Sequence, residues 1–165
     1  MKKITGYLPD NVGFYPDMTG RQNLRFTGRL NGLQGEELEK RIDEMLKRVG
    51  MTNAADRKTG TYSRGMKQRL GIAIALLGHP KLLVLDEPFV GLDPSASVVL
   101  KQNMHALCEE GSAIFFSTHV LDVAEKLCNK IAIIKNGELV VSGETSELTH
   151  GKSLEEVFME VVKGD

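Results

Sequence analysis

Residues 82–88 read Leu-Leu-Val-Leu-Asp-Glu-Pro. Four consecutive apolar residues predict a buried strand, and Pro88 disfavours helical geometry at Glu87, which ends that strand. Ligands of open α/β sheets bind at the carboxyl ends of the strands. Because neighbouring strand residues point to opposite sides, we expect Asp86 and Glu87 to do different work. One carboxylate can hold Mg²⁺ through water while the other orients and deprotonates an attacking water; a solvated strand end is the alternative.

Further strands and helices surround this segment. Apolar runs at 113–116 and 131–134 resemble the run at 82–85, and residues 94–109 and 121–127 between them have helical spacing. This alternation predicts buried parallel strands with crossover helices. The remaining elements expected here are a short strand over 4–8, a hairpin at Asn136 and Gly137 joining 131–135 to 138–141, and a closing helix with the apolar stripe Leu154, Val157, Phe158 and Val161.

In the preceding part of the chain, the spacing of apolar residues predicts helices over 22–33, 36–49 and 64–77. The third helix has Ser63 as its N-cap and Gly78 just past its end. Its free backbone N–H groups, the Ser63 hydroxyl and the small Gly65 form an anion site suited to a phosphate. A well-capped helix without a ligand is the alternative.

Composition limits the function classes. The 165 residues are 41% apolar, and 21 Lys and Arg balance 22 Asp and Glu, so nucleic acid is not an expected partner. Cys108 and Cys128 have no neighbours at metal-ligand spacing, which favours free thiols in a reducing compartment. No run of roughly 20 apolar residues occurs. We therefore expect a cytosolic chain that reaches a membrane only through a partner.

The order of the motifs resembles the ATP-binding domain of ABC transporters, from Ile4 onward. Residues 62–66 are similar to its signature motif, 82–87 to Walker B, 91–93 to the D-loop and 117–119 to the switch histidine loop. The resemblance implies an α/β fold, a partial P-loop NTPase domain with a mainly parallel sheet, crossover helices and an α-helical subdomain. It also implies ATP and Mg²⁺ as cofactors. By this resemblance, Asp86 would bind Mg²⁺, Glu87 would be the general base and His119 would contact the γ-phosphate. Ser63 and Gly65 would bind ATP held by the opposite subunit, and Asp93 would link the two sites.

Two motifs depart from the family pattern. The signature reads Tyr-Ser-Arg-Gly-Met instead of Leu-Ser-Gly-Gly-Gln, and Asp10 stands where the Q-loop usually has Gln. Asp10 can accept a hydrogen bond from water but adds negative charge near ATP. The motifs divide the chain into a Q-loop-like segment with the helical subdomain at 1–80, an α/β core at 81–150 and a C-terminal helix at 151–165.

No Gly-x-x-x-x-Gly-Lys-Ser/Thr loop, the Walker A motif, occurs in this sequence. Residues 151–153 read Gly-Lys-Ser, but Ser146 occupies the position of the earlier glycine, so a helix cap is the better interpretation. A helix N-terminus stabilises an anion by about 0.3–2 kcal/mol, whereas millimolar binding needs about 4 kcal/mol. We therefore expect the chain to be nearly inactive alone.

Two functions remain open. The first is an ATP-binding subunit, or a truncated fragment of one, that couples ATP hydrolysis to export. Its partners are transmembrane permease subunits and a second ATP-binding subunit at the inner face of the cell membrane, and the closing helix at 153–161 is similar to subunits of ABC-2-type exporters. The second is a non-catalytic module that docks on a complete ATPase or a permease.

Overall fold

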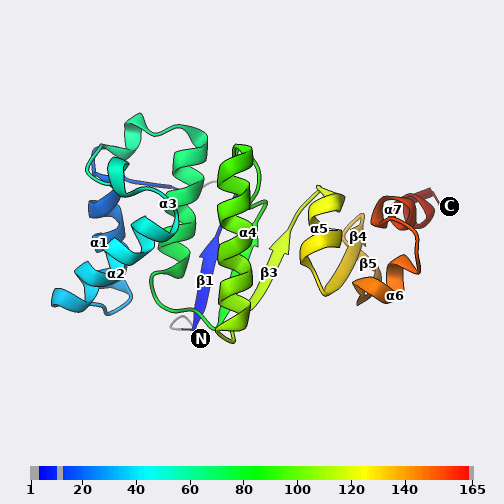
Figure 1. Ribbon diagram of the computed structural model, residues 1–165. Helices are drawn as coiled ribbons and strands as arrows, with labels where there is room; N and C mark the ends of the chain where they lie inside the picture. Colours follow the sequence, from blue (N-terminus) through cyan, green and yellow to red (C-terminus); the bar gives the residue numbers. More distant parts are fainter. Residues whose placement is uncertain (1–3, 11–12, 164–165) are drawn as a thin grey trace. The chain divides into compact units, whose positions relative to one another are not determined.

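The computed structural model describes residues 4–10 and 13–163 (Figure 1). The chain forms two compact units, Met1–Ser117 and Thr118–Asp165. The strands and helices of each unit are given separately below.

The first unit contains a three-stranded parallel sheet. Its strands are β1 (Thr5–Leu8), β2 (Leu82–Asp86) and β3 (Ala113–Ser117), in the order β1-β2-β3. Tyr7 pairs with Val84, and Val84 pairs with Phe115. The predicted strands at 4–8, 82–85 and 113–116 are confirmed, and so is the parallel pairing predicted for the second and third. The prediction that the third strand is buried is wrong, because Phe115 is 62% exposed.

The two faces of this sheet differ in burial. Leu8, Leu83 and Leu85 are at most 1% exposed, on the face that the helices cover. On the opposite face, Tyr7 and Phe115 are 59% and 62% exposed. Parallel sheets usually have both faces covered, so this open face is unusual for the architecture.

In the part of the first unit that the structure describes, the α-helices are α1 (Gly20–Leu30), α2 (Gly35–Arg48), α3 (Arg64–Leu76) and α4 (Pro94–Glu109), with short 3₁₀ turns at Thr52–Ala54 and Thr59–Thr61. Helix α3 packs beside β1 and helix α4 beside β3 (Figure 1). The helical core consists of fully buried side chains from α1, α2 and α3: Leu24, Leu38, Ile42, Met45, Leu46, Leu70 and Leu76. The predicted helices are confirmed, with ends shifted by up to three residues.

The shift at α1 has a local cause. Thr19 and Gln22 form a capping box, in which the Thr19 side chain accepts from Gln22 N and the Gln22 side chain accepts from Thr19 N. This cap starts the helix at Gly20, before the predicted residue 22. At the other end Gly32 has φ +88, and the helix stops at Leu30 rather than continuing to residue 33.

The second unit contains α5 (Leu121–Leu127), the strands β4 (Lys130–Lys135) and β5 (Glu138–Glu144), α6 (Thr145–Thr149) and α7 (Leu154–Lys163). The two strands form an antiparallel hairpin, and Asn136 and Gly137 both have positive φ, as a two-residue hairpin turn requires. The predicted hairpin is confirmed. The expectation that residues 131–134 are a buried strand of the parallel sheet is wrong, because β4 pairs with β5 and Ile134 is 65% exposed. No helix in the described part of the chain has both the length and the apolar character of a membrane span.

Candidate functional site

The acidic pair lies at the carboxyl end of the central strand. Asp86 is the last residue of β2 and pairs in register with Ser117, the last residue of β3. The Ser117 hydroxyl donates to the Asp86 carboxylate and accepts from the Glu87 backbone N–H at 3.2 Å. One serine therefore joins the ends of two neighbouring strands, and it fixes the point where the chain leaves the sheet.

Glu87 turns the chain sharply away from β2. Its φ is +46, in the left-handed region that non-glycine residues seldom occupy. Such conformations cost of order 1–3 kcal/mol and persist where surrounding contacts enforce them. The following residues supply such contacts, because Val90 N donates to Glu87 O at 3.2 Å and the Phe89 ring packs edge-on against Phe116.

The N-terminus of α3 has the predicted cap. Ser63 is in the extended conformation, and its hydroxyl accepts from Met66 N at 3.3 Å. A methyl group at Gly65 would come within 3.0 Å of the Gly91 carbonyl oxygen. Gly65 is thus small enough for the loop after β2 to approach α3, a packing reason that is independent of any phosphate.

Asp93 caps the helix that follows this loop. Its carboxylate accepts from Ser95 Oγ at 2.6 Å and from Ala96 N at 2.9 Å. These two bonds, together with the charge of Arg69, lower the pKa of Asp93. The carboxylate is therefore ionised at neutral pH and oriented by the start of α4.

The other two predicted site residues, Asp10 and His119, each lie two residues after the end of a strand. Asp10 is exposed and follows β1, whose carboxyl end shares an edge with that of β2 because the strands are parallel. His119 is exposed and belongs to the second unit, two residues after β3 ends. Asp86, Glu87 and Ser117 are thus in direct contact, while Ser63 and Gly65 lie at the start of the adjacent helix.

The donor set suits a shared metal site. No group of three or more His, Cys, Asp or Glu side chains gathers among the residues that the structure describes. Mg²⁺ in phosphate-processing sites is usually held by one or two carboxylates together with substrate phosphates and water. Asp86, at the edge of the sheet where ligands bind, has the chemistry for the protein's share of such a site.

The sequence interpretation missed the buried polar side chains that support this region. Gln68 on α3 is 7% exposed and donates to the Pro88 carbonyl at 3.2 Å. Arg41 on α2, also 7% exposed, donates to the carbonyls of Leu76 and Leu77 at the end of α3. A signal for Gln68 was present, because it lies four residues before the buried Ile72 on a helical face.

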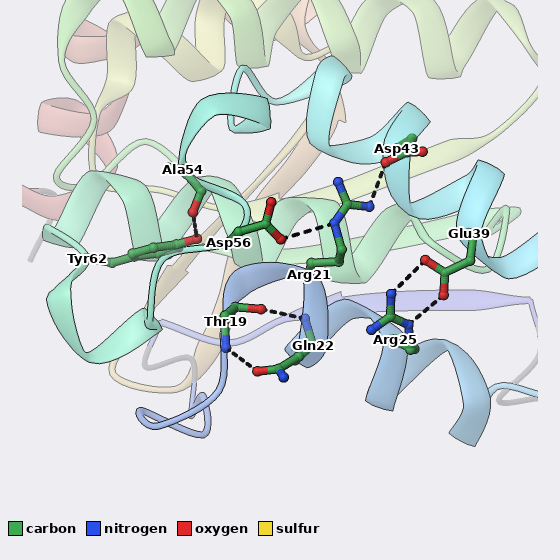
Figure 2. Close-up of polar contacts among 9 residues, drawn as sticks. All are labelled: Thr19, Arg21, Gln22, Arg25, Glu39, Asp43, Ala54, Asp56 and Tyr62. Atoms are coloured by element: carbon green, nitrogen blue, oxygen red, sulfur yellow. Dashed lines mark hydrogen bonds and ion pairs between the residues drawn. The ribbon is translucent and has the colours of Figure 1, made fainter.

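Surface ion pairs hold α1 against α2 and the following loop (Figure 2). Arg21 bonds Asp43 at 2.6 Å, and Arg25 bonds both carboxylate oxygens of Glu39 at 2.5 and 2.8 Å. The hydrogen bond from Arg25 lowers the pKa of Glu39. Figure 2 also shows the Tyr62 hydroxyl donating to Ala54 O at 2.6 Å, which anchors the residue before the Ser63 cap.

Comparisons with known proteins agree on one family. The family model described as "ABC transporter" matches residues 1–90. The ATP-binding protein YxlF of Bacillus subtilis is 46% identical over 147 residues, which are 89% of this chain and 50% of that protein. The linearmycin resistance ATP-binding protein LnrL of the same species is 37% identical over 89% of this chain and 47% of that protein. The chain thus spans about half the length of these curated relatives.

A solved structure agrees with the sequence comparisons. A protein described as the ATP binding subunit of an ABC transporter superposes with a TM-score of 0.89 at 31% identity, over 98% of this chain and 69% of that one. The likeness extends over both units, and the expected partial P-loop NTPase fold is confirmed.

Proposed function

The chain belongs to the family of ABC transporter ATP-binding proteins, and we propose that it supplies the acidic half of one ATP site and the signature half of another. The observation that carries this proposal is the acidic pair at the carboxyl end of β2, with Ser117 bonded to Asp86 and to the Glu87 backbone. This is the edge at which ligands of α/β sheets bind.

Each residue has a distinct task in this proposal. Asp86 holds Mg²⁺ through water, Glu87 orients the attacking water and takes its proton, and His119 contacts the γ-phosphate. A bound Mg²⁺ would neutralise the charge that develops on the phosphate oxygens. Asp10 accepts a hydrogen bond from water near the phosphates. Ser63 and Gly65, at the start of α3, bind ATP held by a second ATP-binding subunit, and the ionised Asp93 links the two sites.

In this proposal the phosphates of ATP are bound by a loop that residues 1–165 do not contain. The positive end of α3 stabilises an anion by about 2 kcal/mol at most, which is half of what millimolar binding needs. The open face at Tyr7 and Phe115 supports a covering segment, because parallel sheets are normally buried on both faces. We propose that a segment carrying the Gly-x-x-x-x-Gly-Lys-Ser/Thr motif covers this face, from the same polypeptide or another, and that the chain is inactive without it.

We propose that ATP hydrolysis drives transport across a membrane. The chain works with transmembrane permease subunits at the inner face of the cell membrane, and the direction is export. One relative is named as a linearmycin resistance ATP-binding protein, and a resistance role of that relative is compatible with this proposal.

A non-catalytic docking module is the second candidate. One apolar cluster favours it: the Tyr15 and Phe26 rings pack edge-to-face at 5.1 Å while 54% and 41% exposed, and Leu30, one turn along α1, is 71% exposed. Clusters of exposed apolar side chains often mark protein contacts. In this alternative the cluster binds a permease or a complete ATPase, and Asp86 and Glu87 have no chemical role.

ATP hydrolysis by an extended protein separates the two candidates. The chain is joined to a phosphate-loop segment from a relative, and phosphate release is measured with Glu87→Gln and with the matched exposed control Glu138→Gln. The ATPase proposal predicts activity that the Glu87 change abolishes and the Glu138 change preserves. Activity that survives Glu87→Gln would remove Glu87 as the base, and a folded protein without activity would favour the docking module.

A further inference from the structure

A buried amide connects α3 to the turn that carries Glu87. Gln68 lies on the second turn of α3 and is 7% exposed. Its side-chain Nε2 donates to the carbonyl oxygen of Pro88 at 3.2 Å. Pro88 directly follows Glu87, so the bond reaches the residue next to the candidate base.

An apolar side chain at position 68 would fill the same space without this bond. Met has a similar length and flexibility, and it carries no amide to desolvate. A glutamine here satisfies the Pro88 carbonyl, which would otherwise lose its partner on burial. The bond also reaches a strained segment, since Glu87 has φ +46 and such a conformation needs surrounding contacts to persist.

A second close approach joins α3 to the loop after β2. Gly65 lies three residues before Gln68, and a Cβ added at Gly65 would be 3.0 Å from the Gly91 carbonyl oxygen. A Cβ on Gly91 would lie 2.9 Å from Cδ of Arg64. The first turns of α3 therefore contact the loop after β2 at Pro88 and again at Gly91.

We propose that Gln68 is a positioning residue: its amide holds the Glu87–Pro88 turn in the conformation in which Glu87 acts as the base. Because the same helix has Ser63 as its N-cap and Gly65 in its first turn, Gln68 links the signature half of one ATP site to the acidic half of the other within one chain. The consequence for hydrolysis rests on the proposed function, whereas the consequence for the turn does not.

Hydrogen exchange of the chain as it stands tests the effect on the turn. The probes are the backbone N–H groups of Val90 and Leu92, which bond to Glu87 O and Phe89 O. Gln68→Met removes one hydrogen bond at constant size, and exchange at these groups should become about fivefold faster. The control is Gln102→Met, the same replacement at an exposed glutamine of α4.

The internal reference is the second half of α3, residues 70–76. Faster exchange confined to residues 87–92 supports the proposal. Equal acceleration in α3 and in the turn would mean that Gln68 only stabilises the fold, and that result would overturn the proposal. Unchanged exchange in the turn would overturn it as well.

Steady-state kinetics of the extended protein tests the effect on the base. Gln68→Met should lower kcat for ATP by about fivefold while KM changes less than about twofold, because the nucleotide contacts are retained. An unchanged kcat, or a rise in KM alone, would overturn the positioning role. If the unaltered extended protein does not hydrolyse ATP, the proposed function fails, and the exchange comparison alone decides whether Gln68 holds the turn.

Discussion

Gly6→Ala tests how closely the sheet and α3 are packed. Gly6 lies on β1, and an added Cβ would be 2.2 Å from the Ala75 carbonyl oxygen of α3, about 1.2 Å short of the ordinary contact that begins at 3.4 Å. The obstacle is backbone, so a rotamer change does not relieve it. Overpacking of this kind costs about 1–3 kcal/mol, and the smaller entropic gain from replacing glycine does not offset it. We expect the free energy of unfolding to fall by about 2 kcal/mol.

Urea unfolding followed by far-UV circular dichroism measures this loss. The matched control is Gly78→Ala, just beyond α3, where an added Cβ meets nothing within 4 Å. The control should unfold at the same urea concentration as the unaltered chain or slightly higher. Equal stability of the two variants would refute the close packing of β1 against α3.

Two further predictions concern charged side chains of the helical part. Arg41→Met should lower the free energy of unfolding by about 2 kcal/mol, because the buried guanidinium bonds two carbonyls at the end of α3. Arg25→Met should lower it by under about 1 kcal/mol, because the ion pair of Arg25 with Glu39 is partly exposed. Urea unfolding midpoints in the reverse order would contradict this prediction. The pKa of Glu39 is lowered by its bond to Arg25, so the carboxylate stabilises the fold above its unfolded pKa, and this contribution is lost as the pH falls through the lower folded value. A carboxyl ¹³C NMR titration should show the pKa of Glu39 below its ordinary value and restored by Arg25→Met; an ordinary pKa in the unaltered chain would contradict the ion pair.

Local signals in the sequence predicted most of the elements. Helix α4 was predicted over 94–109, and it begins at Pro94 with Asp93 as its N-cap, a strong pair of helix-start residues. Asn136 and Gly137 predicted the hairpin for a similarly local reason. The hairpin partner of residues 131–134 was predicted correctly, but their place in a buried parallel sheet was predicted wrongly. An apolar run alone does not specify which sheet a strand joins.

The site was predictable only in its local parts. The position of Asp86 and Glu87 at a strand end follows from four apolar residues before them, and the Ser63 cap follows from residues 63–66. The bridging bonds of Ser117 and the contact between Gln68 and Pro88 join residues about 20–30 positions apart. Such contacts depend on strand order and helix packing, which the composition of either segment does not encode.

Binding of Mg-ATP distinguishes half of a nucleotide site from a complete one. Isothermal titration of the purified chain, alone and after extension with a phosphate-loop segment, measures whether these residues form half of a nucleotide site or a complete one. We expect no saturable binding at micromolar nucleotide for the chain alone, and saturable binding for the extended protein. Micromolar binding of Mg-ATP by the chain alone would contradict this expectation.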